Sequence, residues 1–313
     1  PWIGHGLGSF EAHYMDYQAN FFKQCGQSRF SMLADNVKQP FNEYLGLLLN
    51  FGIIGLLVLL LLMVIIIYCY RKNPSVEKQI AFYSLSSIGI FSFFSYPFAY
   101  PFVWVVTFLS IFIITSEYIK PLFSNILIKK IACMFILTYS LFGSSKLFER
   151  IQAELDWGKA STLALCKSYN ETLPTYERLE KMFVSNPYFL YNYAAVLQEM
   201  KQYTESLEVA LKCRQYWADY DLELIIGENY QQLNKPELAE KYYNSASMMC
   251  PSRFLPLYKL FHLYKTNGEK ERSLAMAEAV ISKPMKIKTT TIRMMKREME
   301  REIQKMNMSI KLE

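Results

Sequence analysis

The sequence has few of the residues from which metal and nucleotide sites are built. It contains three histidines in 313 residues, and its six cysteines are scattered with no Cys-x-x-Cys pair. Zinc-type centres need closely spaced Cys and His ligands. The sequence therefore predicts no metal site and no cofactor, and we interpret most of the cysteines as small packing residues.

Charge is scarce in the first half of the chain. Residues 1–145 carry 9 Lys or Arg and 6 Asp or Glu, against 25 and 22 in residues 146–313. The net charge of +6 is shared evenly, so neither half has the dense basic surface of a nucleic-acid-binding protein. This imbalance predicts hydrocarbon around the first half and water around the second. The chain begins with Pro1 and no signal-peptide pattern precedes its first apolar run, so we expect further sequence upstream.

Uncharged runs in the first half are long enough to cross a membrane. None of residues 44–70 is charged, and about 20 apolar residues in a helix span the hydrocarbon core. A second uncharged run, residues 79–116, is too long for one span and contains Pro97 and Pro101 near its middle, which favours two spans joined by a corner. We predict spans at about 44–70, 79–96, 98–116 and 126–145.

Basic residues in the short loops predict the orientation. They follow the first and third spans: Arg71, Lys72, Lys78, Lys120, Lys129 and Lys130. Loops rich in Lys and Arg stay in the cytoplasm. Residues 1–43, the corner and everything after the fourth span are then outside. We expect a multi-pass protein of a bacterial inner membrane, in contact with membrane lipid, whose second half lies in the periplasm.

The second half repeats itself with a period near 34 residues. The same steps relate four sets of positions: Ser206, Ala239 and Ser273; Ala194, Gly227 and Phe261; Leu197, Tyr230 and Tyr264; Cys213, Ala246 and Val280. This pattern resembles the tetratricopeptide repeat, a helix–turn–helix unit of about 34 residues. We predict an all-α chain whose residues 146–285 form an α-solenoid that binds a protein partner. A weak first unit surrounds Trp157, and residues 286–313 form a capping helix.

Three glycines alternate near the start of the chain, where residues 2–10 read WIGHGLGSF. A dinucleotide-binding loop would read G-x-G-x-x-G between a strand and a helix. Here the spacing differs and a membrane span follows, so we exclude nucleotide binding. We interpret Gly6 and Gly8 as turn residues that let the backbone approach a ligand or a helix closely.

A second motif opens the first span. Asn42-Glu43-Tyr44-Leu45 follows Phe41. Nine residues, 43–51, separate Asn42 from Gly52, and Gly55 follows three residues later. With the glycine segment and the span pattern, it resembles the O-antigen ligase and polymerase superfamily, whose external loop ends in His-Asn-Glu-Tyr-Leu. Phe41 stands in the place of that histidine, so the usual proton carrier of the family is missing.

The resemblance implies a membrane glycosyltransferase of the O-antigen ligase type, acting in lipopolysaccharide or other envelope polysaccharide synthesis. Its donor would be a polyprenyl-diphosphate-linked glycan, and its acceptor a lipid or a protein. Such a reaction needs cations for the diphosphate and an acid–base group near the acceptor hydroxyl. The catalytic candidates are Asn42 and Glu43. The candidates for binding the diphosphate or the glycan are Arg29, Lys38, Gly6 and Gly8.

Plainer interpretations of the same residues stay open. Asn42 and Glu43 can simply cap the first span, and Gly52 and Gly55 can permit close helix packing. The two loop cations can be ordinary surface charges. For function, the alternatives are a polymerase or a protein O-oligosaccharyltransferase of the same superfamily, and a non-catalytic membrane-anchored repeat scaffold for envelope assembly.

Reporter fusions test the orientation. Fusions after Arg71 and after Lys120 are expected to report the cytoplasm, because positive loops are retained there. Fusions near Ala99 and after Glu149 are expected to report the periplasm. A cytoplasmic signal after Glu149 would show that the fourth run does not cross the membrane.

Overall fold

The computed structural model describes residues 2–26, 28–119 and 126–310, and the regular elements in this part of the chain are all helical. Lys120, which the orientation prediction uses, lies outside the described residues. The chain divides into two compact units. The first comprises Pro1–Phe10 and Lys38–Glu154, and the second comprises Glu11–Val37 and Leu155–Glu313. The prediction of an all-α chain is confirmed for the described residues.

The first unit holds the apolar helices. They are α2 (Glu43–Lys72), α3 (Val76–Phe91), the short 3-10 helix η1 (Pro97–Ala99), α4 (Pro101–Ile119) and the first part of α5 (Ile126–Leu165). Among the described residues, α2, α4 and α5 are long and apolar enough to cross a membrane. Crossing itself stays a prediction.

Helix α3 is shorter than the predicted second span. It has 16 residues, which rise about 24 Å. The helix ends at Phe91, ahead of both prolines. Beyond it the amides of Phe93 and Phe94 bond three residues back, to the carbonyl oxygens of Ile90 and Phe91, as in turns. The corner between α3 and α4 therefore begins at Ser92 and includes η1.

Helix α5 passes residue 145 without a break. It is 40 residues long, and from Leu155 onward it belongs to the second unit. There it pairs with α6 (Tyr169–Leu179): Arg178 binds Asp156 at 2.8 Å, and the Trp157 ring lies 5.4 Å from that of Phe183. The weak repeat around Trp157 is thus a helix pair whose first helix continues directly from the fourth apolar run.

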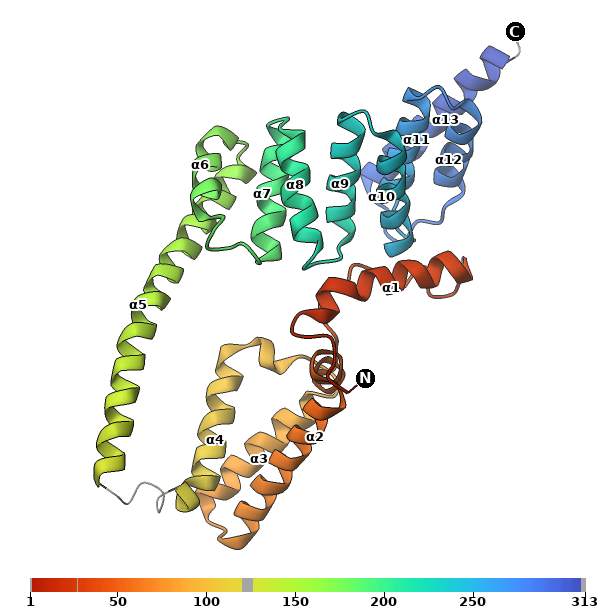
Figure 1. Cartoon of the computed structure of the whole chain (residues 1–313). Coiled ribbons are helices and arrows are strands. Elements are labelled where there is room, and N and C mark those ends of the chain that lie inside the picture. The colour runs from red at the N-terminus through yellow and green to blue at the C-terminus, as the bar shows by residue number, and fades with distance from the viewer. Residues whose placement is uncertain (1, 27, 120–125, 311–313) are drawn as a thin grey trace. The chain divides into compact units, whose positions relative to one another are not determined.

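Three further helix pairs follow. They are α7 (Pro187–Glu199) with α8 (Tyr203–Arg214), α9 (Tyr220–Gln232) with α10 (Pro236–Met249), and α11 (Leu255–Thr266) with α12 (Lys270–Ser282). The helices stand side by side, and each pair contacts the next (Figure 1). The recurring residues occupy equivalent buried places: Ala194, Gly227 and Phe261 on the first helices, and Ser206, Ala239 and Ser273 on the second. The tetratricopeptide-like solenoid is confirmed.

A residue with left-handed backbone follows the first helix of each pair. Its φ is 64° at Lys167, 62° at Lys201, 55° at Asn234 and 78° at Gly268, at steps of 34, 33 and 34 residues. This conformation reverses the chain into the second helix and favours Gly or Asn. Two of the four positions hold lysine, so the residue type alone does not predict the left-handed turn between the two helices of each pair.

Helix α13 (Thr290–Ile310) covers the end of the last pair. Met299 is buried in a cluster with Phe254, Phe261 and Val280. Four more apolar residues of the helix pack around that cluster: Ile292, Met295, Ile303 and Met306. The apolar side of α13 therefore shields the end of the last repeat, as a capping helix does.

Gly227 marks a close contact between the two helices of a pair. A Cβ there would lie 2.7 Å from the buried ring of Tyr243. We expect Gly227→Ala to lower the free energy of unfolding by about 1–3 kcal/mol through overpacking. Gly158→Ala is the matched control, since a Cβ there meets nothing within 4 Å and alanine favours a helix by about 0.5–1 kcal/mol. Thermal unfolding of the full chain compares them, and equal stabilities would contradict the close contact.

Candidate functional site

Asn42 caps α2 and also binds the corner after α3. Its Oδ1 accepts a hydrogen bond from the amide of Leu45 at 3.0 Å, as an N-cap residue does. Its Nδ2 donates to the carbonyl oxygen of Phe93 at 3.1 Å. Both ends of the side-chain amide are therefore bonded within the protein.

Glu43 binds the same corner, and Tyr44 binds the last turn of α3 just before it. The Glu43 amide donates to the carbonyl oxygen of Ser92 at 2.9 Å, and its Oε1 accepts from the amide of Phe98 at 3.0 Å. The Tyr44 hydroxyl donates to the carbonyl oxygen of Gly89 at 2.7 Å. The carboxylate also lies in the first turn of α2, where the helix dipole favours negative charge. These side chains form what we call the corner latch: Asn42, Glu43 and Tyr44.

Phe41 makes an aromatic contact at the place of the family's histidine. Its exposed ring meets Tyr96 edge-on, with ring centroids 5.5 Å apart. A phenylalanine ring has no ionisable group and can neither take nor give a proton. The structure thus has a hydrophobic contact where the resemblance implies an acid–base group.

Helix α2 is broken at Gly52, whose φ of 66° and ψ of −161° are not helical. The N-terminal segment pairs with the backbone on both sides of the break. Three hydrogen bonds join them: His5 N to Leu49 O (2.9 Å), Gly6 N to Asn50 O (2.9 Å) and Ile54 N to Trp2 O (3.1 Å). Backbone groups that an unbroken helix would pair internally are therefore paired with the glycine segment.

Two glycines allow this close pairing. A Cβ on Gly52 would lie 2.3 Å from the carbonyl oxygen of Trp2, and one on Gly4 would lie 2.6 Å from the backbone of Asn50. Both glycines have positive φ, which disfavours any other residue. Gly52 thus serves backbone pairing, whereas a Cβ on Gly55 would meet the Phe51 side chain of the same helix.

Gly6 and Gly8 are turn residues in open surroundings. Their φ values are 91° and 78°, and a Cβ on either would meet nothing within 4 Å. The amide of Gly6 donates to the carbonyl oxygen of Asn50 in α2, and ligand binding by either glycine stays a prediction.

Asn50 is a residue that the sequence-based site prediction did not include. It stands beside the break, and its Oδ1 is buried without a hydrogen-bond partner among the described residues. Polar groups inside apolar membrane helices are costly and mark functional positions. The sequence feature that could have identified Asn50 is its polar side chain within the uncharged run 44–70.

The two predicted loop cations belong to different units. Arg29 is exposed, and its guanidinium carbon lies 4.8 Å from the centroid of the Phe30 ring. Lys38 is an exposed residue of the first unit. Neither unit by itself brings the two together, and among the described residues no three His, Cys, Asp or Glu side chains gather as metal ligands.

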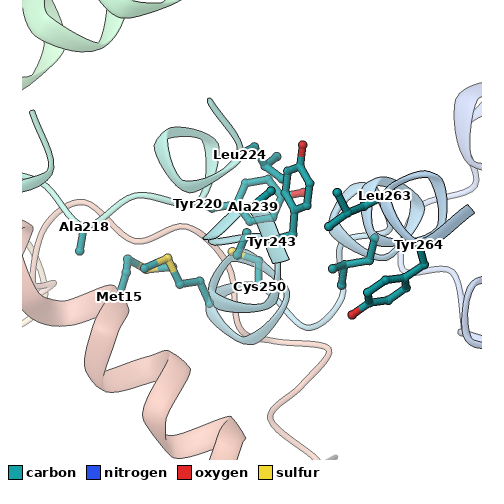
Figure 2. Packing of buried hydrophobic residues seen from close by; sticks show 12 residues of the cluster. Met15, Ala218, Tyr220, Leu224, Ala239, Tyr243, Cys250, Leu263 and Tyr264 are labelled. Atoms are coloured by element: carbon teal, nitrogen blue, oxygen red, sulfur yellow. The ribbon is translucent and has the colours of Figure 1, made fainter. Parts of the chain in front are cut away.

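The segment Glu11–Val37, here called the loop segment, packs on the repeat array within the second unit. It contains most of α1 (Ser9–Cys25). Met15 of this helix is buried in the cluster that includes Ala218 and Cys250 (Figure 2). These two partners lie in or beside connections between successive helix pairs, so the loop segment packs on the ends of the helices.

Acidic side chains of the loop segment meet arginines of the array. The Arg214 guanidinium contacts both Asp16 and the buried carboxylate of Glu223, and Arg253 binds Asp35 at 2.9 Å. Burial disfavours the charge on Asp35, but the hydrogen bonds from Arg253 and the Asn36 amide and the charges of Arg253 and Lys286 together outweigh it. They hold the pKa of this carboxyl below its ordinary value. The loop segment is therefore part of the fold of the array.

Comparisons with known proteins find distant similarity to solved structures. No protein-family model matches the chain, and no curated protein matches its sequence. The solved structure of MamA protein is 13% identical over 49% of this chain and 89% of that one, with a TM-score of 0.39. MamA from Desulfovibrio magneticus RS-1 is 18% identical over 47% of this chain and 76% of that one, with a TM-score of 0.38. YrrB, described as a TPR protein with an unusual peptide-binding site, is 19% identical over 41% of this chain and 66% of that one, with a TM-score of 0.37. At these values the likeness says nothing of function, and the repeat fold rests on the helix pairs themselves.

The corner latch predicts different effects for two substitutions of Glu43. Glu43→Ala removes the acceptor for the Phe98 amide and is expected to cost about 0.5–1.5 kcal/mol of stability. Glu43→Gln keeps an oxygen in the same place and is the matched control. Thermal unfolding of the full chain in one detergent measures both. An alanine variant as stable as the glutamine variant would contradict the latch.

Proposed function

We propose that the chain is a membrane-anchored scaffold whose loop segment and repeat array act as one protein-binding body in the periplasm. The observation that carries this proposal is the packing of the loop segment on the array, through Met15 and the ion pairs of Arg214 and Arg253. Helical-repeat arrays bind partners through extended surfaces. The apolar helices anchor this body in the inner membrane.

The same packing supports an even number of membrane crossings. The loop segment precedes α2 and the array follows α5, yet one compact unit has to lie on one side of the membrane. If only α2, α4 and α5 crossed, the two parts would be on opposite sides, so α3 has to cross too. A helix of about 24 Å is accommodated by local thinning of the bilayer. At its start Lys78 pairs with Glu117 at 3.0 Å, which reduces the cost of their charges.

A second candidate function is the glycan transfer that the resemblance implies. The break in α2 favours it. In a membrane, non-helical backbone is tolerated where it is buried in protein or lines a water-filled cavity. Asn50 adds a buried side-chain oxygen there that has no hydrogen-bond partner in the described part of the chain. In that reaction the acceptor hydroxyl attacks the anomeric carbon, its proton passes to a base and the lipid diphosphate leaves.

This second function assigns chemical roles to the motif and to the loop cations. Glu43 would take or orient the proton, and Asn42 would bind a sugar hydroxyl or the diphosphate. Arg29 and Lys38 would neutralise the diphosphate. The roles of Asn42 and Glu43 compete with observed ones, because their side chains already bond to the corner.

One pair of variants of the full-length protein separates the two functions. Glu43→Gln keeps the bond from the Phe98 amide, so a scaffold is expected to leave the envelope glycan profile unchanged. A catalytic base would lose about 10²–10⁴ in transfer rate. Asp16→Arg places a second positive charge next to Arg214, and the repulsion is expected to detach the loop segment from the array. The scaffold function is then lost, while the protein still inserts into the membrane. Loss of transfer in Glu43→Gln, measured with a lipid-linked glycan, would overturn the scaffold proposal and establish the transferase.

A further inference from the structure

The loop segment has an exposed apolar face. Met15 and Phe22 are buried, whereas four large apolar side chains on other sides of the segment are open to solvent: Tyr17 (67% exposed), Phe21 (41%), Phe30 (45%) and Leu33 (73%). Tyr17 and Phe21 are one helical turn apart. Phe21 and Phe30 meet edge-on with centroids 6.4 Å apart, and the amide of Leu33 donates to the carbonyl oxygen of Phe30. We call these four residues the aromatic patch.

The charges of the segment are segregated. Its three carboxylates are engaged with the array: Glu11 with the Tyr188 hydroxyl, Asp16 with Arg214, and Asp35 with Arg253. Its two cations, Lys23 and Arg29, are exposed, and Arg29 lies over the Phe30 ring. The surface that the segment leaves open thus combines aromatic rings with positive charge, while its negative charge is bound to the array.

Covalent geometry keeps the loop segment near the first apolar helix, whatever arrangement the two units take. Only residues 38–42 separate Val37 from Glu43 at the start of α2, about 20 Å of fully extended chain. On the other side, four residues separate Glu11 from Gly6, whose amide is bonded to Asn50 of α2. Both ends of the segment are therefore tied to the beginning of a helix that is apolar enough to cross a membrane.

From these observations we propose that the aromatic patch, with Lys23 and Arg29, lies in the headgroup region of the membrane and binds its phospholipids. Aromatic rings are favoured at the membrane interface, and exposed cations are attracted to headgroup phosphates, most strongly in anionic lipid. A lipid surface fits better than a protein partner because the tethers at both ends hold the patch close to the bilayer. The inference rests on the proposed membrane anchoring of the chain.

Quenching by brominated lipids tests the proposal on the full chain in lipid nanodiscs. A fluorescent amino acid replaces one residue at a time and leaves the native cysteines in place. At Tyr17 and at Leu33, lipids brominated near the headgroup end of their chains are expected to quench the emission severalfold more than at Leu238. Leu238 is the matched control, since it is an exposed apolar residue of α10 in the array.

A label at Leu60 distinguishes failure of the patch from failure of the anchor. Leu60 is an exposed residue within α2, and deeply brominated lipids are expected to quench it if that helix spans the bilayer. Quenching at Leu60 with no more at Tyr17 and Leu33 than at Leu238 would overturn the lipid contact and leave the anchoring intact. No quenching at Leu60 would overturn both.

Charge reversal tests the two cations. In nanodiscs with anionic lipid, Lys23→Glu combined with Arg29→Glu is expected to reduce the quenching at Leu33, because the open surface then repels the headgroups. Lys241→Glu, which reverses an exposed charge of α10, is the control. Unchanged quenching in the double variant would overturn the role of the cations.

Discussion

The guanidinium of Arg214 holds together two parts of the chain that lie far apart in the sequence. It contacts Asp16 in α1 and the buried carboxylate of Glu223 in α9. A buried carboxylate without a partner is strongly destabilising, so the array needs this arginine for its own packing. Burial still raises the pKa of Glu223 against the effect of Arg214. Because the same group binds Asp16, the segment before the first apolar helix is ordered by the array that follows the last one.

Features with a period or a uniform composition could be predicted from the sequence. The spacing of Ser206, Ala239 and Ser273 revealed the helix pairs, and the absence of charge over residues 44–70 revealed the apolar helix. The packing of Met15 on the array could not be predicted, because a single contact between distant segments leaves no repeating pattern. The left-handed backbone of Lys167 and Lys201 could not be predicted for a related reason. Tertiary packing there overrides the preference of lysine for negative φ.

The candidate site shows why a motif alone does not separate chemistry from structure. Glu43 has an acid–base side chain and Asn42 a hydrogen-bonding one. Atoms of both that could bind a substrate are bonded to the corner between α3 and α4. The sequence correctly indicated that Asn42 could cap a helix. It gave no sign that Gly52 breaks that helix ten residues later. A glycine can stand either at a close helix–helix contact or at a break in a helix, and the sequence does not distinguish the two.

The contacts of the loop segment also bear on how many repeats the protein can have. Arrays of stacked helix pairs lengthen or shorten by whole units, since each pair contacts only its neighbours. Here Asp16 binds beside the connection that follows α8, while Asp35 reaches Arg253 after α10 and Lys286 after α12. A duplicated or deleted pair would move those partners out of reach of one or the other. The short loop segment therefore fixes the number of repeats between the partners of Asp16 and those of Asp35, a restraint that free-standing solenoids lack.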